Sequence, residues 1–393
     1  MNLYTRFVSI SLIAISLLFS IECCVANNNF ERAKATYEAI YKHYSIEGSH
    51  LLRETFPFSD SHKVTYLDNS EQADKRNEYS YLWPYSGSLS ATSSLYEVKG
   101  EAKYKKLFNK KVIAGLEMYW DTLRQPGAYA SYIKINPLPD RFYDDNIWIG
   151  IDFTDMFIAT KNKSYLAKAE YVWKFIESGT DKILGDGIYW VEQRKGSKHA
   201  CSNAPGAVYA AKLFIATKNQ YYLRRAIELY SWTKKNLQDS QDYLIYDNIR
   251  INGSVDKKKY AYNSGQMLQA ASLLFKLTKD ASYLDDAKNI AESSFKYFFK
   301  DTSSDGQLDF NLLKTGDIWF TAVMLRGYIE LFDIERDSKY IDTFKKNLDY
   351  AWKYMREDNG LFNSDWSGKK KDNSKWLLTQ FAMVEMYARI SKL

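Results

Sequence analysis

The chain has 393 residues, of which 46% are hydrophobic and 16% aromatic, enough apolar material for one large core. Its 54 basic and 48 acidic residues give a formal net charge of +6 and are interspersed, whereas a nucleic-acid-binding protein needs a dense basic face. No stretch rich in proline, glycine and serine separates two halves of the chain. These features favour a single globular domain and exclude nucleic acid as a partner.

The first 26 residues predict an export signal, because a basic residue precedes an apolar run at 7–21 that gives way to small or polar residues. The run is too short to span a membrane. Cleavage after Ala26 fits the small residue at that position, and lipidation of Cys23, as in bacterial lipoproteins, is the alternative. In either case we expect residues 27–393 to form one domain that reaches the periplasm, the cell surface or the medium.

Cysteine and histidine usage points away from disulfides and metals. After cleavage at Ala26, Cys201 would be the remaining cysteine, so the fold must rely on its core. A single cysteine is more often a small buried hydrophobe than a nucleophile. The histidines lack the spacing of metal ligands, so we expect neither a metal nor another cofactor. They are His43, His50, His62 and His199.

A short motif recurs at near-constant spacing along the chain. Its clearest copies lie at 161–166, 218–223 and 279–284 and end in Tyr-Leu, and weaker copies lie at 101–104 and 337–341. The tyrosines of these copies are 61, 57, 61 and 57 residues apart, which suits one long helical hairpin per step. They are Tyr104, Tyr165, Tyr222, Tyr283 and Tyr340.

Each repeat has two kinds of helical segment. Before the tyrosine lies a segment that is apolar nearly all round, such as 148–159 or 267–277, and after it lies one with a single apolar stripe, such as 166–176. Helices that are apolar all round are buried, whereas helices with one stripe face water on the other side. The pattern predicts an inner ring of helices wrapped by an outer ring.

The number and order of these segments predict how the ring closes. We expect inner helices to start near Tyr81, Asp145, Ala204, Ser264, Ile318 and Trp376, and outer helices near Phe30, Ala102, Ser164, Tyr221, Ala281 and Ser338. An outer helix at the start and an inner helix at the end favour a closed, all-α (α/α)6 toroid, because open solenoids usually need polar capping repeats. The inner helices then run parallel, with their N-termini at one face.

The residues at these inner-helix starts should form the floor of one cleft. They are rich in Trp, Tyr, Asn and Asp, which suits a sugar: aromatic faces cover the C–H surface of a pyranose ring, and Asn and Asp bind its hydroxyls. We predict substrate contacts from Trp83, Tyr85, Tyr143, Asn146, Trp190, Asn203, Tyr262, Asn263 and Trp319. Core packing is the alternative for the tryptophans, helix capping is the alternative for Asn203, and Glu192 is expected in a surface ion pair.

Asp144 and Asp145 are an adjacent acidic pair at an inner-helix start. Capping is the structural alternative, because acids in the first turn complement the helix dipole. The catalytic interpretation is a glycosidase pair, in which one carboxylate attacks or stabilises the anomeric carbon and the other protonates the leaving oxygen. A neighbouring like charge and aromatic walls would raise the pKa of the acid.

At these residues the chain resembles glycoside hydrolase family 76, the endo-α-1,6-mannanases. The resemblance extends from about Phe30 to the C-terminus and keeps the order and spacing of several independent motifs. The motifs are YLWPYSG at 81–87, YDDNIW at 143–148, GIYW at 187–190, CSNAP at 201–205 and YNSG at 262–265.

The resemblance implies an (α/α)6 barrel and metal-independent hydrolysis, with retention of configuration, inside α-1,6-linked mannan or manno-oligosaccharides. By position, Asp144 matches the nucleophile and Asp145 the acid/base. Ile147 stands where the family often has a small residue, which bears on the shape of a subsite more than on the chemistry. Transglycosylation through the same intermediate, or glycan binding without turnover, remain the alternatives.

Overall fold

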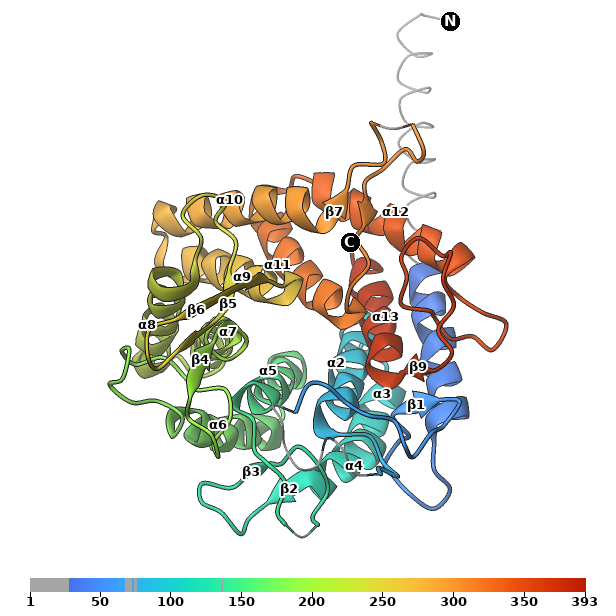
Figure 1. Ribbon diagram of the computed structural model, residues 1–393, viewed down its shortest axis with the longest axis horizontal. Coiled ribbons are helices and arrows are strands. Elements are labelled where there is room, and N and C mark those ends of the chain that lie inside the picture. Colours follow the sequence, from blue (N-terminus) through green and yellow to red (C-terminus); the bar gives the residue numbers. More distant parts are fainter. Residues whose placement is uncertain (1–27, 68–72, 74–75, 136, 305) are drawn as a thin grey trace, which may run out of the picture.

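The computed structural model describes residues 28–67, 73, 76–135, 137–304 and 306–393. The predicted export signal, residues 1–26 with Cys23, lies outside this part of the chain. Two concentric rings of helices dominate the fold (Figure 1). No helix in the described ranges has the length and apolar character needed to cross a membrane.

The inner ring is closed. Consecutive inner helices pack against each other, and the last packs on the first, as Figure 1 shows. The (α/α)6 prediction is therefore confirmed. The inner helices are α2 (Leu82–Lys99), α5 (Tyr143–Thr160), α7 (Ala200–Thr217), α9 (Ala261–Thr278), α11 (Ile318–Glu335) and α13 (Leu377–Ile390).

The outer ring covers the inner one with helices that bury a single face. It contains a helix at 28–44, α6 (Lys163–Glu177), α8 (Gln220–Leu237), α10 (Ala281–Phe298) and α12 (Lys339–Tyr354). Its second member is interrupted and runs through α3 (Ala102–Leu107), the π-helical η1 (Phe108–Ile113), α4 (Ala114–Leu116) and the 3-10 helix η2 (Glu117–Tyr119).

The repeated sequence motif is the turn from an inner to an outer helix. The five inner helices that lead into an outer helix end on a residue with left-handed backbone, and the residue after it can cap the outer helix. Asn162, Asn219 and Asp280 accept hydrogen bonds from the backbone N–H two residues on, at 3.1, 3.0 and 2.9 Å. The left-handed residues, with φ from 58° to 65°, are Gly100, Lys161, Lys218, Lys279 and Arg336. A recurrent short turn thus produces the sequence repeat.

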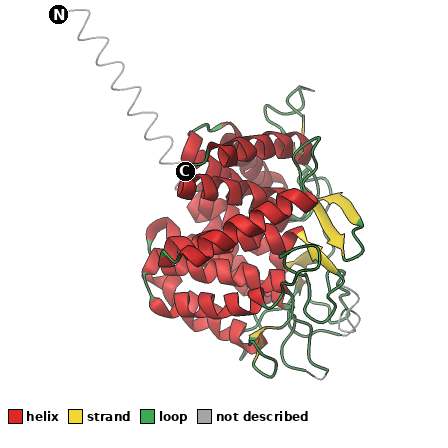
Figure 2. Cartoon of the chain, turned by 90° about the vertical axis from the view of Figure 1, so that its left-hand side faces the viewer, coloured by secondary structure: helices red, strands yellow, loops and turns green. Residues whose placement is uncertain are grey.

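The strands are short, antiparallel and lie in the connections before the inner helices. Figure 2 shows them, with the long loops, gathered at one face of the helical barrel. β4 (Ser197–His199), β5 (Tyr246–Arg250) and β6 (Val255–Lys259) form one sheet in that order. The remaining pairs are β1 (Thr55–Phe56) with β9 (Lys375–Trp376), β2 (Trp120–Asp121) with β3 (Ala128–Tyr129), and β7 (Phe299–Lys300) with β8 (Leu312–Leu313).

Glycines allow α9 and α11 to approach closely. A Cβ added to Gly265 would lie 2.4 Å from the Cα of Met324, and one added to Gly327 would lie 2.4 Å from the carbonyl oxygen of Gly265. Neither neighbour is a side-chain tip that can swing aside, because both contacts are to backbone atoms. Any larger residue must therefore separate two helices of the closed ring.

We expect Gly265→Ala to lower the free energy of unfolding by about 1–3 kcal/mol, because the added methyl group forces α9 and α11 apart. Urea unfolding followed by circular dichroism measures this change. Gly196→Ala is the matched control, because a Cβ there meets nothing within 4 Å. Equal stability of the two variants would contradict the tight packing.

Candidate active site

A cleft of about 560 Å³ opens at the face where the inner helices begin. The start of each inner helix contributes to it. The second residue of five inner helices lines the cleft, and Trp376, just before α13, supplies the sixth contribution. The five second-position residues are Trp83, Asp144, Cys201, Tyr262 and Trp319. Because the inner helices are arranged in a ring and begin at one face, these five side chains converge on the same cleft.

Asp144 and Asp145 occupy the second and third positions of α5, and both line the cleft. The Trp190 indole Nε1 donates a hydrogen bond to Asp144 Oδ2 at 3.0 Å, and Asp144 Oδ1 has no hydrogen-bond partner among the described residues. Asp145 is buried, with 8% of its surface exposed. Phe142, at the N-cap, makes no side-chain cap, so the two acids follow the cap position and do not occupy it.

The two carboxyl groups hold protons differently. Burial raises the pKa of Asp144 to about 6, against the opposing effect of contacts that include Cys201 and Trp190. Burial together with the negative charge of Asp144 raises the pKa of Asp145 well above its usual range. The additional charge effect on Asp145 makes Asp144 the group of the pair that ionises first as pH rises, and Asp145 the group that holds its proton longer.

Two residues beside the pair stay uncharged. The His199 ring stacks on Trp190 at a centroid distance of 4.6 Å and an interplanar angle of 19°, and burial lowers its pKa to about 3. Burial, followed by the charge of Asp144, raises the pKa of the Cys201 thiol well above its usual range. The wall next to Asp144 is thus a neutral imidazole and a protonated thiol.

Aromatic rings line much of the rest of the cleft. Trp319 lies edge-on to Trp83 and Trp148, with ring centroids 5.4 and 5.0 Å apart. Tyr262 stacks on Phe320 at 4.0 Å and 17°. Such surfaces suit the C–H faces of sugar rings. The predicted cleft residues Trp83, Trp190, Tyr262 and Trp319 are therefore brought together with the acidic pair.

Five other predicted contact residues lie outside the cleft: Tyr85, Tyr143, Asn146, Asn203 and Asn263. All five side chains are buried, so the structure places them behind the residues that line the cleft. The Tyr143 ring stacks on Phe175 of α6 at 4.6 Å, and the Tyr85 hydroxyl donates to the carbonyl oxygens of Val112 (3.0 Å) and His50 (3.2 Å). Both tyrosines therefore face the outer ring.

Two of these three asparagines, Asn146 and Asn203, bind the backbone of the connections that precede their helices. Asn146 Oδ1 accepts from Tyr129 N at 2.9 Å, and its Nδ2 donates to Tyr129 O at 2.9 Å. In the same way, Asn203 Oδ1 accepts from Ile188 N at 2.7 Å, and Asn203 Nδ2 donates to Ile188 O at 2.9 Å. Both amides are fourth residues of inner helices, about 200° round the helix from the second residue, and so point away from the cleft.

Several cleft features come from residues that the sequence did not single out as site residues. Asp247 on β5 and Asp317, the N-cap of α11, line the cleft, and burial raises the pKa of both, that of Asp317 to about 6. Asp317 carried a signal, since it directly precedes a predicted inner helix. Asp247 carried none that separates it from other acids in irregular connections.

The buried carboxyl group of Glu54 accepts hydrogen bonds from two residues that line the cleft. Its Oε1 accepts hydrogen bonds from the Tyr66 hydroxyl at 2.5 Å and the Trp376 indole at 3.2 Å, and its Oε2 accepts from Tyr81 N at 2.9 Å. Tyr66 and Trp376 both line the cleft. Burial raises the pKa of Glu54 to about 7. This carboxyl group joins a connection near the start of the chain to α13.

Within the described ranges, no three His, Cys, Asp or Glu side chains are grouped so that they could hold a metal ion.

We expect Cys201 to resist alkylation in the folded protein, because the thiol is buried and its pKa is raised well above the usual range. In a protein lacking residues 1–26, Cys201 is the single thiol. Iodoacetamide labelling at pH 8, followed by mass spectrometry, should be on the order of 100-fold slower than labelling of free cysteine. Full labelling in denaturant is the control, and fast labelling of the folded protein would contradict a protonated thiol.

Comparison with known proteins agrees with this architecture. A solved family 76 glycoside hydrolase (mannosidase) from Bacteroides thetaiotaomicron is 34% identical, with a TM-score of 0.82 over 93% of this chain and 98% of that one. An inactive variant of an α-1,6-mannanase from Salegentibacter shares the fold, with 22% identity and a TM-score of 0.73 over 93% of this chain and 98% of that one. In that variant two consecutive aspartates are replaced, and the structure is a complex with α-1,6-mannotriose.

A curated mannan endo-1,6-α-mannosidase from Candida glabrata is 26% identical over 189 residues, which are 44% of this chain and 41% of that protein. The chain spans about half the length of the curated relatives it matches. The family model described as glycosyl hydrolase family 76 matches residues 58–391. The chain belongs to glycoside hydrolase family 76.

Proposed function

We propose that the protein is an exported, retaining glycoside hydrolase that cleaves internal α-1,6-mannosidic linkages. The observation that carries this proposal is the pair of adjacent carboxyl groups of Asp144 and Asp145 at the cleft, with the Trp190 indole donating a hydrogen bond to Asp144. A retaining glycosidase needs such a pair, because one group must attack as an anion while the other delivers a proton.

In the first step, an Asp144 oxygen forms a bond to the anomeric carbon while the bond from that carbon to the leaving oxygen breaks. Asp145 gives its proton to the leaving oxygen. In the second step, Asp145 takes a proton from water, whose oxygen attacks the anomeric carbon and releases Asp144. The parallel inner helices present their positive N-terminal ends at this face and favour the negative charge on Asp144.

The substrate class is supported by the cleft and by the relatives. Aromatic rings offer platforms for sugar faces, and Asp247 and Asp317 offer buried carboxyl oxygens to sugar hydroxyls. The inactive Salegentibacter variant is in complex with α-1,6-mannotriose, and the Candida glabrata protein is named as a mannan endo-1,6-α-mannosidase. The export part of the proposal is supported by the sequence of residues 1–26 alone.

The first test is incubation with linear α-1,6-linked mannan, followed by chromatography of the products over time. We expect mixed short oligosaccharides early in the reaction, whereas mannose alone would indicate exo action and longer products would indicate transglycosylation. Asp144→Asn should lower kcat on the order of 1,000-fold or more, because an amide cannot act as the nucleophile, and should leave oligosaccharide binding by calorimetry intact. Full activity of this variant would remove Asp144 from the mechanism.

The dependence of kcat/KM on pH should be bell-shaped. Asp144 must be ionised, so activity should be lost as pH falls below about 6, the raised pKa of this group. Asp145 must be protonated, so activity should also be lost as pH rises through its pKa, which lies well above the usual range. Initial rates at low substrate concentration, followed from pH 4 upward, measure the acid limb first and then the basic limb. A profile flat between pH 4 and 6 would contradict the assignment of Asp144.

A further inference from the structure

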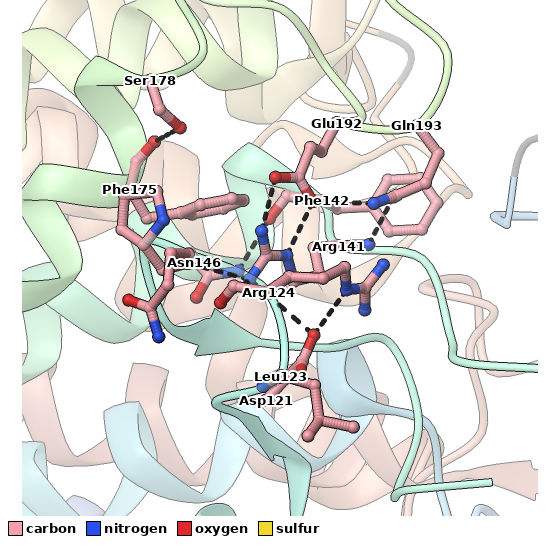
Figure 3. Close-up of polar contacts among 12 residues, drawn as sticks. Asp121, Leu123, Arg124, Arg141, Phe142, Asn146, Phe175, Ser178, Glu192 and Gln193 are labelled. Carbon is pink, nitrogen blue, oxygen red and sulfur yellow. Dashed lines mark hydrogen bonds and ion pairs between the residues drawn. The ribbon is translucent and has the colours of Figure 1, made fainter.

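Arg141 is a fully buried arginine that lies one residue before the N-cap of α5 and does not line the cleft. Its Nε donates to Glu192 Oε2 at 2.6 Å, and its Nη2 donates to Glu192 Oε1, which makes a two-pronged ion pair (Figure 3). Its Nη1 donates to the carbonyl oxygens of Pro126 (2.9 Å) and Arg124 (3.2 Å). The buried charge therefore has partners on every nitrogen.

Beside this ion pair, two chain segments run antiparallel. Glu192 N donates to Arg141 O at 3.0 Å, Tyr143 N donates to Trp190 O at 2.8 Å, and Phe142 and Val191 form an antiparallel bridge between these contacts. Segment 190–192 is thus paired by backbone hydrogen bonds with residues 141–143, which lead into α5. The Arg141–Glu192 ion pair lies at one end of this antiparallel pairing. The expected surface ion pair of Glu192 is instead a pair with a buried partner.

Segment 190–192 carries a side chain that reaches the acidic pair. The Trp190 Nε1–H donates to Asp144 Oδ2 at 3.0 Å, and its ring packs between His199 and Phe142, at centroid distances of 4.6 and 5.2 Å. This hydrogen bond is among the contacts that lower the pKa of Asp144 against the effect of burial. The hydrogen bond from the Trp190 indole to Asp144 therefore depends on the register in which residues 190–192 pair with residues 141–143.

We propose that the Arg141–Glu192 ion pair is a positioning pair that holds the Trp190 indole on Asp144 from behind the cleft. Neither residue touches the substrate. The kinetic consequence of this proposal rests on the proposed glycosidase function, whereas its structural consequence, a weaker indole–carboxylate hydrogen bond when the pair is broken, does not.

Breaking the pair should raise the pKa of Asp144, because a carboxylate that loses a donor ionises less readily. Glu192→Gln removes the charge and keeps the shape, and Arg141→Lys keeps the charge and removes the fork. The acid limb of kcat/KM should move up by about half a pH unit or more, and kcat should fall about tenfold with KM within about twofold. The titratable groups that share the cleft wall around Asp144 stay in place: Asp145, His199, Cys201, Asp247 and Tyr262.

A direct readout uses the full chain labelled with ¹⁵N-indole tryptophan, without substrate. The Trp190 Nε1–H resonance is identified among the 10 tryptophans by its loss in Trp190→Phe. In the unmodified protein we expect this resonance to titrate with a midpoint near pH 6, the pKa of Asp144. In Glu192→Gln and Arg141→Lys the midpoint should be higher. Glu192→Gln is the decisive variant, because 21% of the Glu192 side chain is exposed and the change is isosteric.

The matched control is Asp155→Asn. It breaks the Lys212–Asp155 ion pair, at 2.6 Å, near the C-terminal end of α5. It should lower the melting temperature and leave the indole titration and the acid limb unchanged. If Glu192→Gln behaves like this control, the Arg141–Glu192 pair only stabilises the fold and the proposal is overturned. If the unmodified protein cleaves no α-1,6-mannan, the proposed function fails, while the indole titration still decides the positioning role.

Discussion

The packing of α13 on α2 is the contact on which the site depends, because it closes the inner ring. Closure keeps the inner helices parallel and level, so their N-terminal N–H groups and positive dipole ends meet at one face. All connections into inner helices must cross that face, and they supply the walls of the cleft. An open array of the same hairpins would spread these groups along a surface.

Within this frame, helix geometry sorts side chains by their position in the first turn. In five of the six inner helices the second residue lines the cleft, whereas the fourth residue of several of them points back at the preceding connection. In α5, α7, α9 and α13 the fourth residue binds backbone groups of that connection. These residues are Asn146, Asn203, Ser264 and Gln380. The cleft and the scaffold under it are therefore built from alternating faces of the same helical turns.

Much of this architecture could be predicted from the sequence, because helical periodicity and the repeated capping turn leave a regular trace. The adjacent aspartates were recognisable by their place at an inner-helix start. Tyr85 and Asn203 also lie at inner-helix starts, but both are fourth residues, and helix geometry turns fourth residues away from the side that carries the second residue.

The irregular connections were less predictable, because no period governs them. Glu54 contacts Trp376, a residue 322 positions away, through one indole hydrogen bond. Asp247 reaches the cleft from a short strand, and Arg141 meets Glu192 across 51 residues. Such contacts arise from tertiary packing of single side chains, and the local sequence around each of them resembles that of an ordinary surface loop.

The joining of distant chain segments by β1 and β9 also bears on how the protein unfolds. Tyr44, at the end of the 28–44 helix, donates to Lys375 O at 2.9 Å, and Thr55 faces Trp376 in the strand pair. In an open repeat array the outermost unit has one neighbour and frays first. Here the first and last hairpins are neighbours of each other, so loss of either one opens the ring. We therefore expect the ring to unfold in a single cooperative transition, without earlier unfolding of the first or last hairpin.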